Sequence, residues 1–324
     1  MSRQVRIARL FVLAFALILG LGYPAAAVQK DKDDKKKKAP PTGTPVLWRE
    51  PTDIATRNLL LGPGGEAMKP DWSKLTFIRE ETGGYSKKYR VRDAAGRVWV
   101  AKIGKESQSE TAASRLVWAA GYYSEVQYLA PSATIEGKGT FENVRLEARP
   151  DEWDRLEIWK WEQNPFTGTR ELQGLKVLMA LLENWDIKDD NNKIVYVPGP
   201  NGQNELRYII SDLGATFGKT DSPGGVGSWL RQIRGTRNEP GDFAGDKFIT
   251  GVQAGKVVLD YEGKNSKMMK DVTVEDARWL GSHLSKLSDE QIADAFRAAN
   301  YDAEDVRLLT RAVRSRIDEL VNLK

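Results

Sequence analysis

The sequence predicts an α+β protein with a strand-rich N-terminal lobe, a helical C-terminal lobe and a cleft between them. The first observation is the stretch 74–103, where side chains alternate around glycine-bearing turns as they do in two consecutive β-hairpins. The second is the helical spacing of apolar residues within 169–185 and again after residue 273. With 324 residues, 40% of them hydrophobic, the chain is long enough to bury the core that two lobes require.

The N-terminus has the pattern of a secretory signal peptide over residues 1–27. A basic start with Arg3, Arg6 and Arg9 is followed by an apolar stretch and by three alanines that end at Ala27. We therefore expect an exported protein, periplasmic or extracellular, with no integral membrane segment after cleavage. An uncleaved anchor is the alternative, because the apolar stretch is short for a full membrane span but long enough to anchor the chain.

Residues 28–46, rich in lysine and proline, are predicted to form a solvated tether. The alternative is that the lysine run of this segment has a function and attaches weakly to anionic surfaces. Residues 1–38 carry nine basic and three acidic side chains, so the total net charge of +4 leaves −2 for the remainder. A nearly neutral body argues against nucleic acid as a partner.

Residues 47–150 are predicted to form the strand-rich lobe. A helix is expected at 107–123, where Ser107 followed three residues later by Glu110 has the spacing of a capping box. The strands of this lobe are expected at 74–80, 87–93, 97–104 and 141–149.

Residues 151–324 are predicted to form the helical lobe. A buried helix at 169–185 precedes a hairpin made by strands at 193–197 and 206–218. The glycine-rich stretch 214–255 is expected to be mostly loop. Three further helices are expected to start near Thr273, Ser288 and Asp302, each of which is a good N-cap residue.

The chain has no cysteine, and His283 is its only histidine. A structural role for this histidine within a helix is far more common than a catalytic one. Zinc sites built from His and Cys are therefore excluded, and Ser-His-Asp or Cys-His machinery is disfavoured. Carboxylate, amide and lysine chemistry remains, which suits phosphate together with Mg²⁺ or Ca²⁺.

The acidic stretch "ENWDIKDDNN" (183–192) follows the buried helix directly. It fails as a calcium loop, because the sixth and twelfth positions counted from Asp186 are Asn191 and Val197 instead of Gly and Glu. Asp186, Lys188 and Asn191 offer a carboxylate, a cation and an amide, as phosphoryl transfer requires. A polar turn is the alternative. Asp189, Asp190 and Asn192 are assigned to solvent and turn roles.

Two further residues extend this pattern. Asp212, at the end of the second strand of the hairpin, is placed to bridge Mg²⁺ to phosphate, with Gly214 giving the backbone freedom to turn. Lys102, at the end of the third strand, is placed to reach the α- and β-phosphates of a nucleotide. The alternatives are a snorkelling Lys102 and a merely surface-exposed Lys188.

The motifs "VAK" (100–102), "WDIKDDNN" and "SDLG" resemble the strand lysine, catalytic loop and metal-binding triplet of the protein-kinase-like fold, in the same chain order. The chain is also similar to a group of exported bacterial proteins that carry the blocks "ETAASRLVWAAGY" and "NPFTGTRELQGLKVLMALLENWDIKDDNN". The kinase resemblance implies Asp186 as the base that acts on the acceptor, with Lys188 near the γ-phosphate. It implies Asn191 and Asp212 as ligands of Mg²⁺ or Mn²⁺. It also implies that Lys102, with Glu110 as its partner, binds the phosphates of ATP or another nucleotide, and that Gly83 and Gly84 form a short glycine loop.

The sequence departs from the kinase pattern in several places. Trp185 stands where the family has an arginine, Gly83-Gly84 lacks the G-x-G-x-x-G spacing, and residues 215–255 hold no "APE"-like anchor for a peptide substrate. We expect a metal-dependent phosphotransferase with a hydroxyl acceptor on a protein, sugar or lipid. The alternative is an inactive kinase-like scaffold of the cell envelope. A third hypothesis, a carbohydrate-binding protein, rests on the tryptophans of 153–161, which are more typical of core packing.

Overall fold

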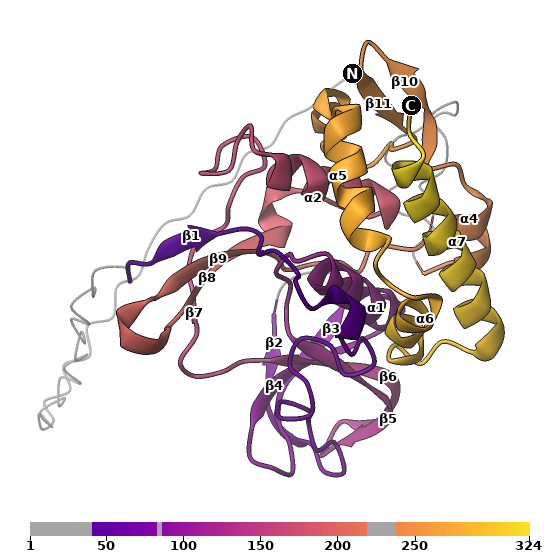
Figure 1. The fold of residues 1–324 in the computed structure, drawn as a ribbon. Coiled ribbons are helices and arrows are strands. Elements are labelled where there is room, and N and C mark those ends of the chain that lie inside the picture. Colours follow the sequence, from indigo (N-terminus) through magenta and orange to yellow (C-terminus); the bar gives the residue numbers. More distant parts are fainter. Residues whose placement is uncertain (1–40, 83–85, 219–237) are drawn as a thin grey trace, which may run out of the picture. The chain divides into compact units, whose positions relative to one another are not determined.

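The computed structural model describes residues 41–82, 86–218 and 238–324 (Figure 1). The predicted signal peptide, most of the predicted tether, and Gly83 and Gly84 lie outside the described residues. Pro40–Lys324 forms one compact unit. Within the described residues, no helix combines the length and apolar character that a membrane span needs.

An antiparallel five-stranded sheet in the order β2-β3-β4-β6-β5 forms the strand-rich part. The four strands expected from the sequence are confirmed, whereas β5 was not predicted. Strand β5 lacks the alternation of buried and exposed residues that predicts a strand, because its first four residues are all buried. As an edge strand it tolerates Pro131, which has no N–H to donate. The strands are β2 (Thr76–Glu81), β3 (Lys87–Arg92), β4 (Val98–Ile103), β5 (Gln127–Ile135) and β6 (Gly139–Ala148).

Helix α1 (Glu106–Ala119) packs against β4, β5 and β6 of this sheet. The predicted capping box is wrong, because the helix begins one residue earlier and Ser107 lies inside its first turn. The Ser107 hydroxyl instead donates to the carbonyl of Lys102 at 3.1 Å. Glu110 is thereby available to turn toward Lys102.

A second sheet in the order β1-β9-β8-β7 carries the predicted hairpin, which is confirmed as β8 (Asn192–Val197) and β9 (Glu205–Ile210). Strand β7 (Asp154–Arg155) pairs with β8. The last residues of the predicted tether, Thr44–Val46, are not a tether but form β1, parallel to β9. The next residue, Leu47, is buried in the same apolar cluster as the helices, which anchors this end of the described chain.

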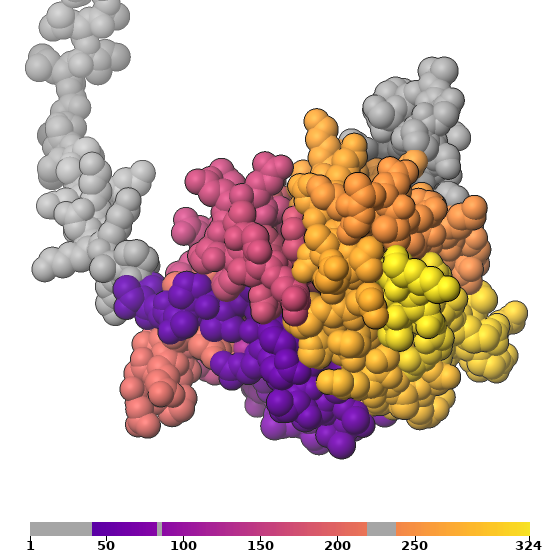
Figure 2. Space-filling view, turned by 45° about the horizontal axis from the view of Figure 1, so that its top comes forward, coloured from indigo at the N-terminus to yellow at the C-terminus, as the bar shows by residue number. Residues whose placement is uncertain are grey.

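The helical part is built from α2 (Arg170–Leu181), α5 (Val274–Leu284), α6 (Asp289–Arg297) and α7 (Ala303–Val321). The three predicted starts are confirmed, because the side chains of the N-cap residues Thr273, Ser288 and Asp302 accept hydrogen bonds from the first turns of their helices. Helices α5 and α7 pack side by side, in orange and yellow in Figure 2.

Trp159 and Trp161 are 3% and 2% exposed, so both belong to the core and not to a sugar-binding surface. Their rings lie 4.9 Å apart between centroids. The Trp159 indole N–H donates to the carbonyl of Ile209 on β9, which ties this segment to the hairpin.

The described part of the stretch 214–255 combines the expected loop with two short regular elements. It contains α4 (Pro240–Gly245) and the first strand of a hairpin formed by β10 (Ile249–Gln253) and β11 (Lys256–Leu259). Ala254 and Gly255 take positive φ values of 50° and 74° in the hairpin turn. Glycine within β10 interrupts the alternation that would have identified the strand.

Arg316 of α7 ties the C-terminal helix to the end of α2. Its guanidinium, 3% exposed, lies 2.6 Å from a carboxylate oxygen of Glu183. It also donates to the carbonyls of Leu181 and Phe243, each at 2.8 Å. Because Glu183 begins the stretch that carries Asp186, this pair holds the start of the candidate catalytic loop.

We predict that Arg316→Met destabilises the protein by about 3–5 kcal/mol, because it leaves a buried carboxylate without its guanidinium. Arg314→Met on the same helix is the matched control, since Arg314 pairs with the exposed Asp289 and such pairs contribute about 0–1 kcal/mol. Urea unfolding of both variants provides the measurement. Equal losses would contradict a special role for Arg316.

Candidate active site

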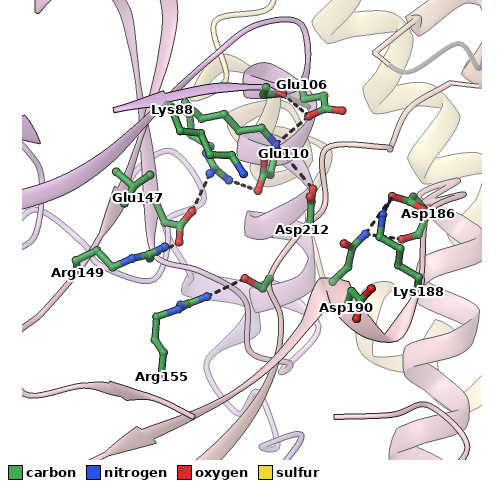
Figure 3. Close-up of a pocket in the computed structure, with 16 residues that line it drawn as sticks. Lys88, Glu106, Glu110, Glu147, Arg149, Arg155, Asp186, Lys188, Asp190 and Asp212 are labelled. Atoms are coloured by element: carbon green, nitrogen blue, oxygen red, sulfur yellow. Dashed lines mark hydrogen bonds and ion pairs between the residues drawn. The ribbon is translucent and has the colours of Figure 1, made fainter. Parts of the chain in front are cut away.

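A cleft of about 460 Å³ lies between the five-stranded sheet, α1 and the β8–β9 hairpin (Figure 3). It brings together six of the residues singled out from the sequence. They are Lys102, Glu110, Asp186, Lys188, Asn191 and Asp212. These residues come from four separate segments of the chain, so their convergence is a property of the fold.

Lys102 of β4 is the buried cation of the cleft, with 2% of its surface exposed. Its Nζ lies 2.8 Å from Glu110 and 2.9 Å from Glu106, both on α1, and 3.8 Å from Asp212. Burial alone would lower the pKa of Lys102, but these carboxylates outweigh burial and raise the pKa above its ordinary value. The ammonium is therefore charged at every physiological pH.

Glu110 occupies the position facing Lys102 that the kinase resemblance implies. Its second carboxylate oxygen contacts Arg145 of β6, and its backbone carbonyl accepts a hydrogen bond from Gln127 at 3.0 Å. With 1% of its surface exposed, Glu110 has a pKa that burial raises above its ordinary value, and the neighbouring Arg145 and Lys102 oppose that rise by favouring the ionised carboxylate. The choice left open by the sequence, between a cap and an ion pair, is thus resolved in favour of the ion pair.

The stretch 183–192 folds as a compact loop around Asp186. Lys188 Nζ lies 2.9 Å from the Asp186 carboxylate. The Asn191 side-chain amide donates to the Asp186 backbone carbonyl at 2.6 Å and to its carboxylate at 3.2 Å. These contacts orient the carboxylate of Asp186 along the cleft wall (Figure 3).

Two residues assigned from the sequence to solvent or turn roles have structural partners instead. Asp189 accepts a hydrogen bond from the backbone N–H of Trp161 at 3.1 Å. Asn192 is buried and donates to the carbonyl of Trp159 at 3.1 Å. The buried tryptophan segment therefore fixes the far side of the loop.

Asp212 follows β9 and faces the loop across the cleft. Its backbone N–H donates to the carbonyl of Asn191 at 3.2 Å, which links the two candidate metal ligands. Its carboxylate accepts from the N–H of Gly214 at 3.0 Å. A Cβ at Gly214 would lie 2.9 Å from the Cβ of Glu106, so the close approach to α1 requires glycine here.

The donor set fits a divalent ion shared with phosphate. Among the described residues, no group of three or more His, Cys, Asp or Glu side chains is arranged to hold a metal alone. Mg²⁺ typically binds one or two protein carboxylates, with phosphates and water completing its octahedron. The Asp212 carboxylate can serve as such a ligand. The side-chain NH₂ of Asn191 donates to Asp186, so the amide oxygen of Asn191 is the atom left to bind the ion.

The end of β6 and the segment after it bring to the cleft an ion-pair network that was not predicted. Arg145 and Arg149 both contact Glu147, and Arg155 lies 2.6 Å from Glu125. The alternating charges of "RLEAR" at the end of β6 were the available signal, because alternate residues of a strand share a face. The alternation alone did not show that this face lines a cleft.

No protein-family model matches the sequence, and no curated protein matches it. Among solved structures, the chain is similar to the proinflammatory kinase CtkA of Helicobacter pylori, with 12% identity over 76% of this chain and 94% of that chain and a TM-score of 0.45. It is also similar to a Rio2 kinase–ADP/Mg²⁺–phosphoaspartate complex from Chaetomium thermophilum, with 13% identity over 78% and 74% of the two chains and a TM-score of 0.32. A third similarity is to the Golgi casein kinase, with 11% identity over 76% and 74% and a TM-score of 0.28.

The arrangement of the elements agrees with the architecture predicted from the sequence. A sheet-rich part with one packed helix faces a helical part that carries a hairpin, and the cleft lies between them. The chain therefore has a two-lobed α+β fold, with a strand-rich part, a helical part and a cleft between them.

Proposed function

We propose that this protein is an exported, metal-dependent kinase-like phosphotransferase that moves a phosphoryl group from a nucleotide to a hydroxyl acceptor. The observation that carries the proposal is the convergence of two clusters in one cleft. Lys102 with its carboxylate partners lies on one side, and Asp186 with Lys188 and Asn191 lies on the other. The acceptor hydroxyl would belong to a protein, sugar or lipid.

Asp186 is placed to act on the acceptor. A carboxylate held in one orientation can accept the proton of an attacking hydroxyl and align it with the phosphoryl group. Asn191 and Lys188 provide that orientation through the contacts described above. Lys188, with its side chain 49% exposed, can also turn toward the charge that develops on the transferred group.

Lys102 and Asp212 are placed to act on the nucleotide phosphates. The ammonium of Lys102 is fixed by Glu110 and can donate to phosphate oxygens without reorganising. Asp212 and Asn191 would hold Mg²⁺ or Mn²⁺, which would neutralise phosphate charge. Positioning and charge neutralisation supply most of the catalysis in phosphoryl transfer, and these residues offer both, which supports the proposal.

ATP together with Mg²⁺ or Mn²⁺ is expected to raise the melting temperature of the mature protein. A ligand at 100 times its Kd contributes about 2.7 kcal/mol, which thermal denaturation detects readily. Asp212→Ala should abolish the shift, because it removes a metal ligand. Asp151→Ala, on an exposed turn, is the control and should keep the shift. The absence of a shift with any nucleotide would refute the proposal.

Asp186→Asn should lower phosphoryl transfer by about 100-fold or more, because loss of a general base typically costs 10²–10⁴ in rate. Transfer is measured as label moved from nucleotide to protein or as phosphate released. The same variant should retain the nucleotide-induced thermal shift, since Asp186 is not placed on the nucleotide. Unchanged transfer in Asp186→Asn would remove Asp186 from the mechanism.

A second candidate function, a catalytically inactive kinase-like scaffold of the cell envelope, is favoured by the charged lining of the cleft. Among the lining residues that the structure describes, Val100 is the one with an apolar side chain. Sites for flat organic ligands are usually lined mostly by apolar groups, so the ion-pair network is a poor surface for a base. This candidate predicts that neither nucleotide turnover nor the effect of Asp186→Asn will be observed.

The ion-pair network itself has a pH signature. Burial would raise the pKa of Glu147, but Arg149, Arg145 and Arg155 outweigh burial and lower it from 4.5 to about 2. A carboxyl with a lowered pKa in the folded state stabilises that state above its ordinary pKa, and this contribution is lost as pH falls toward the lowered value.

We therefore expect the free energy of unfolding of the wild type to exceed that of Glu147→Gln by a constant amount above about pH 5, and the difference to shrink between about pH 4.5 and pH 2. Urea unfolding of both proteins at each pH gives the difference between their free energies of unfolding. Because both proteins contain the other titrating groups, the effects of those groups cancel in the difference. A difference that does not change with pH would show that the network is not formed in solution.

A further inference from the structure

We propose that Lys88 is a second phosphate-binding cation of the cleft, and that it offers a positive charge that no carboxylate pairs with, as Lys102 cannot. The inference deepens the proposed function and rests on it, since it assigns a residue that holds the polyphosphate part of the cleft's ligand. Lys88 was not singled out from the sequence, because it lies in the run of charged residues that begins β3.

The register of the sheet places Lys88 beside Lys102. The two residues are direct partners in the antiparallel pair of β3 and β4. Opposed residues in such a pair share a face, with Cβ atoms about 4.5–5.5 Å apart. Both residues line the cleft, and Figure 3 shows Lys88 on the same side of it as Glu106 and Glu110.

The charge of the Lys102 cluster is not positive. Lys102 and Arg145 carry two positive charges, against three negative charges on Glu106, Glu110 and Asp212. The cleft as a whole has no excess of positive charge either, because six cationic side chains, Lys88 among them, and six anionic side chains line it. A polyphosphate therefore meets a site that is neutral overall, and it needs a cation whose charge is not already compensated.

Lys88 meets that need. The guanidinium groups that line the cleft are paired with Glu110, Glu147 or Glu125, and Lys188 is paired with Asp186. In the described part of the chain, Lys88 is the lining cation that has no carboxylate oxygen within the 4.0 Å of an ion pair. An ammonium of this kind binds phosphate as a point charge.

The neighbouring Lys87 provides a matched control. It lies on the same strand with the same charge but points to the opposite face, because successive side chains of a strand alternate. Its Nζ lies 5.2 Å from the centroid of the Tyr89 ring and 5.7 Å from that of Phe141, away from the cleft. Lys87→Gln removes the same charge from nearly the same place without touching the site.

The test is isothermal titration of tripolyphosphate and of ATP, each with Mg²⁺, into the wild type, Lys88→Gln, Lys88→Arg and Lys87→Gln. We expect Lys88→Gln to weaken binding of both ligands about tenfold, which corresponds to about 1.4 kcal/mol. Lys88→Arg should restore most of this loss, and Lys87→Gln should stay within about twofold of the wild type at moderate salt, where distant surface charges are screened. Circular dichroism of each variant confirms that it is folded.

The outcomes separate this inference from the proposed function. Binding of ATP that is equal in the wild type and Lys88→Gln overturns the inference and leaves the phosphotransferase proposal intact. Binding of tripolyphosphate that depends on Lys88, with no binding of any nucleotide, supports the inference and refutes the nucleotide proposal. If Lys87→Gln weakens binding as much as Lys88→Gln, the effect is one of general charge and the inference is wrong. Failure of the wild type to bind either ligand overturns both.

Discussion

The buried ammonium of Lys102 is the constraint on which the arrangement of the cleft depends. Moving an ion out of water costs several kcal/mol unless it is paired and hydrogen-bonded. The partners come from two places, Glu110 and Glu106 on α1 and Asp212 after β9, so the sheet, the helix and the hairpin must all be in place together. The cleft is therefore preorganised by its own ion pairs, and a ligand would enter a site whose geometry is already set.

The opposite wall of the cleft is held by a different kind of contact. The Asp186 loop is braced from behind by the segment 261–265, since Tyr261 donates to the carbonyl of Asn184 and the N–H of Lys264 donates to the carbonyl of Trp185, both at 2.7 Å. A Cβ at Gly263 would lie 2.5 Å from the Cα of Trp185, so the backbone packs directly on the loop. Trp185, which stands where the resembling family has an arginine, thus takes part in a backbone brace.

A feature of the structure could be predicted where it depends on residues that are close together in the sequence, and not where it depends on the tertiary fold. Strand alternation in 74–103 and the N-caps at Thr273, Ser288 and Asp302 depend on near neighbours in the chain, and both predictions hold. The spacing of Ser107 and Glu110 fits a cap equally well, but the buried Lys102 requires a counter-charge, and only the tertiary fold supplies that information. Strand β5 was missed for a similar reason, because the burial of its first four residues comes from packing against α1 and the sheet.

The same distinction applies to the site. The resemblance of the motifs that carry Lys102, Asp186, Asn191 and Asp212 to the kinase pattern implied that these residues meet, and all four line the cleft. The charged neighbours Lys88, Arg145, Glu147 and Arg149 were not predicted, since their role depends on which face of the sheet lines the cleft.

These charged neighbours decide which ligands the cleft can bind. Arg145, Arg149 and Arg155 all have carboxylate partners, so a neutral base would gain little beside them, and a nucleotide would take its affinity mainly from its phosphates. Affinity that comes mostly from charge falls as the salt concentration rises and changes little with the identity of the nucleotide base. These two properties together would distinguish the cleft from an apolar nucleotide pocket.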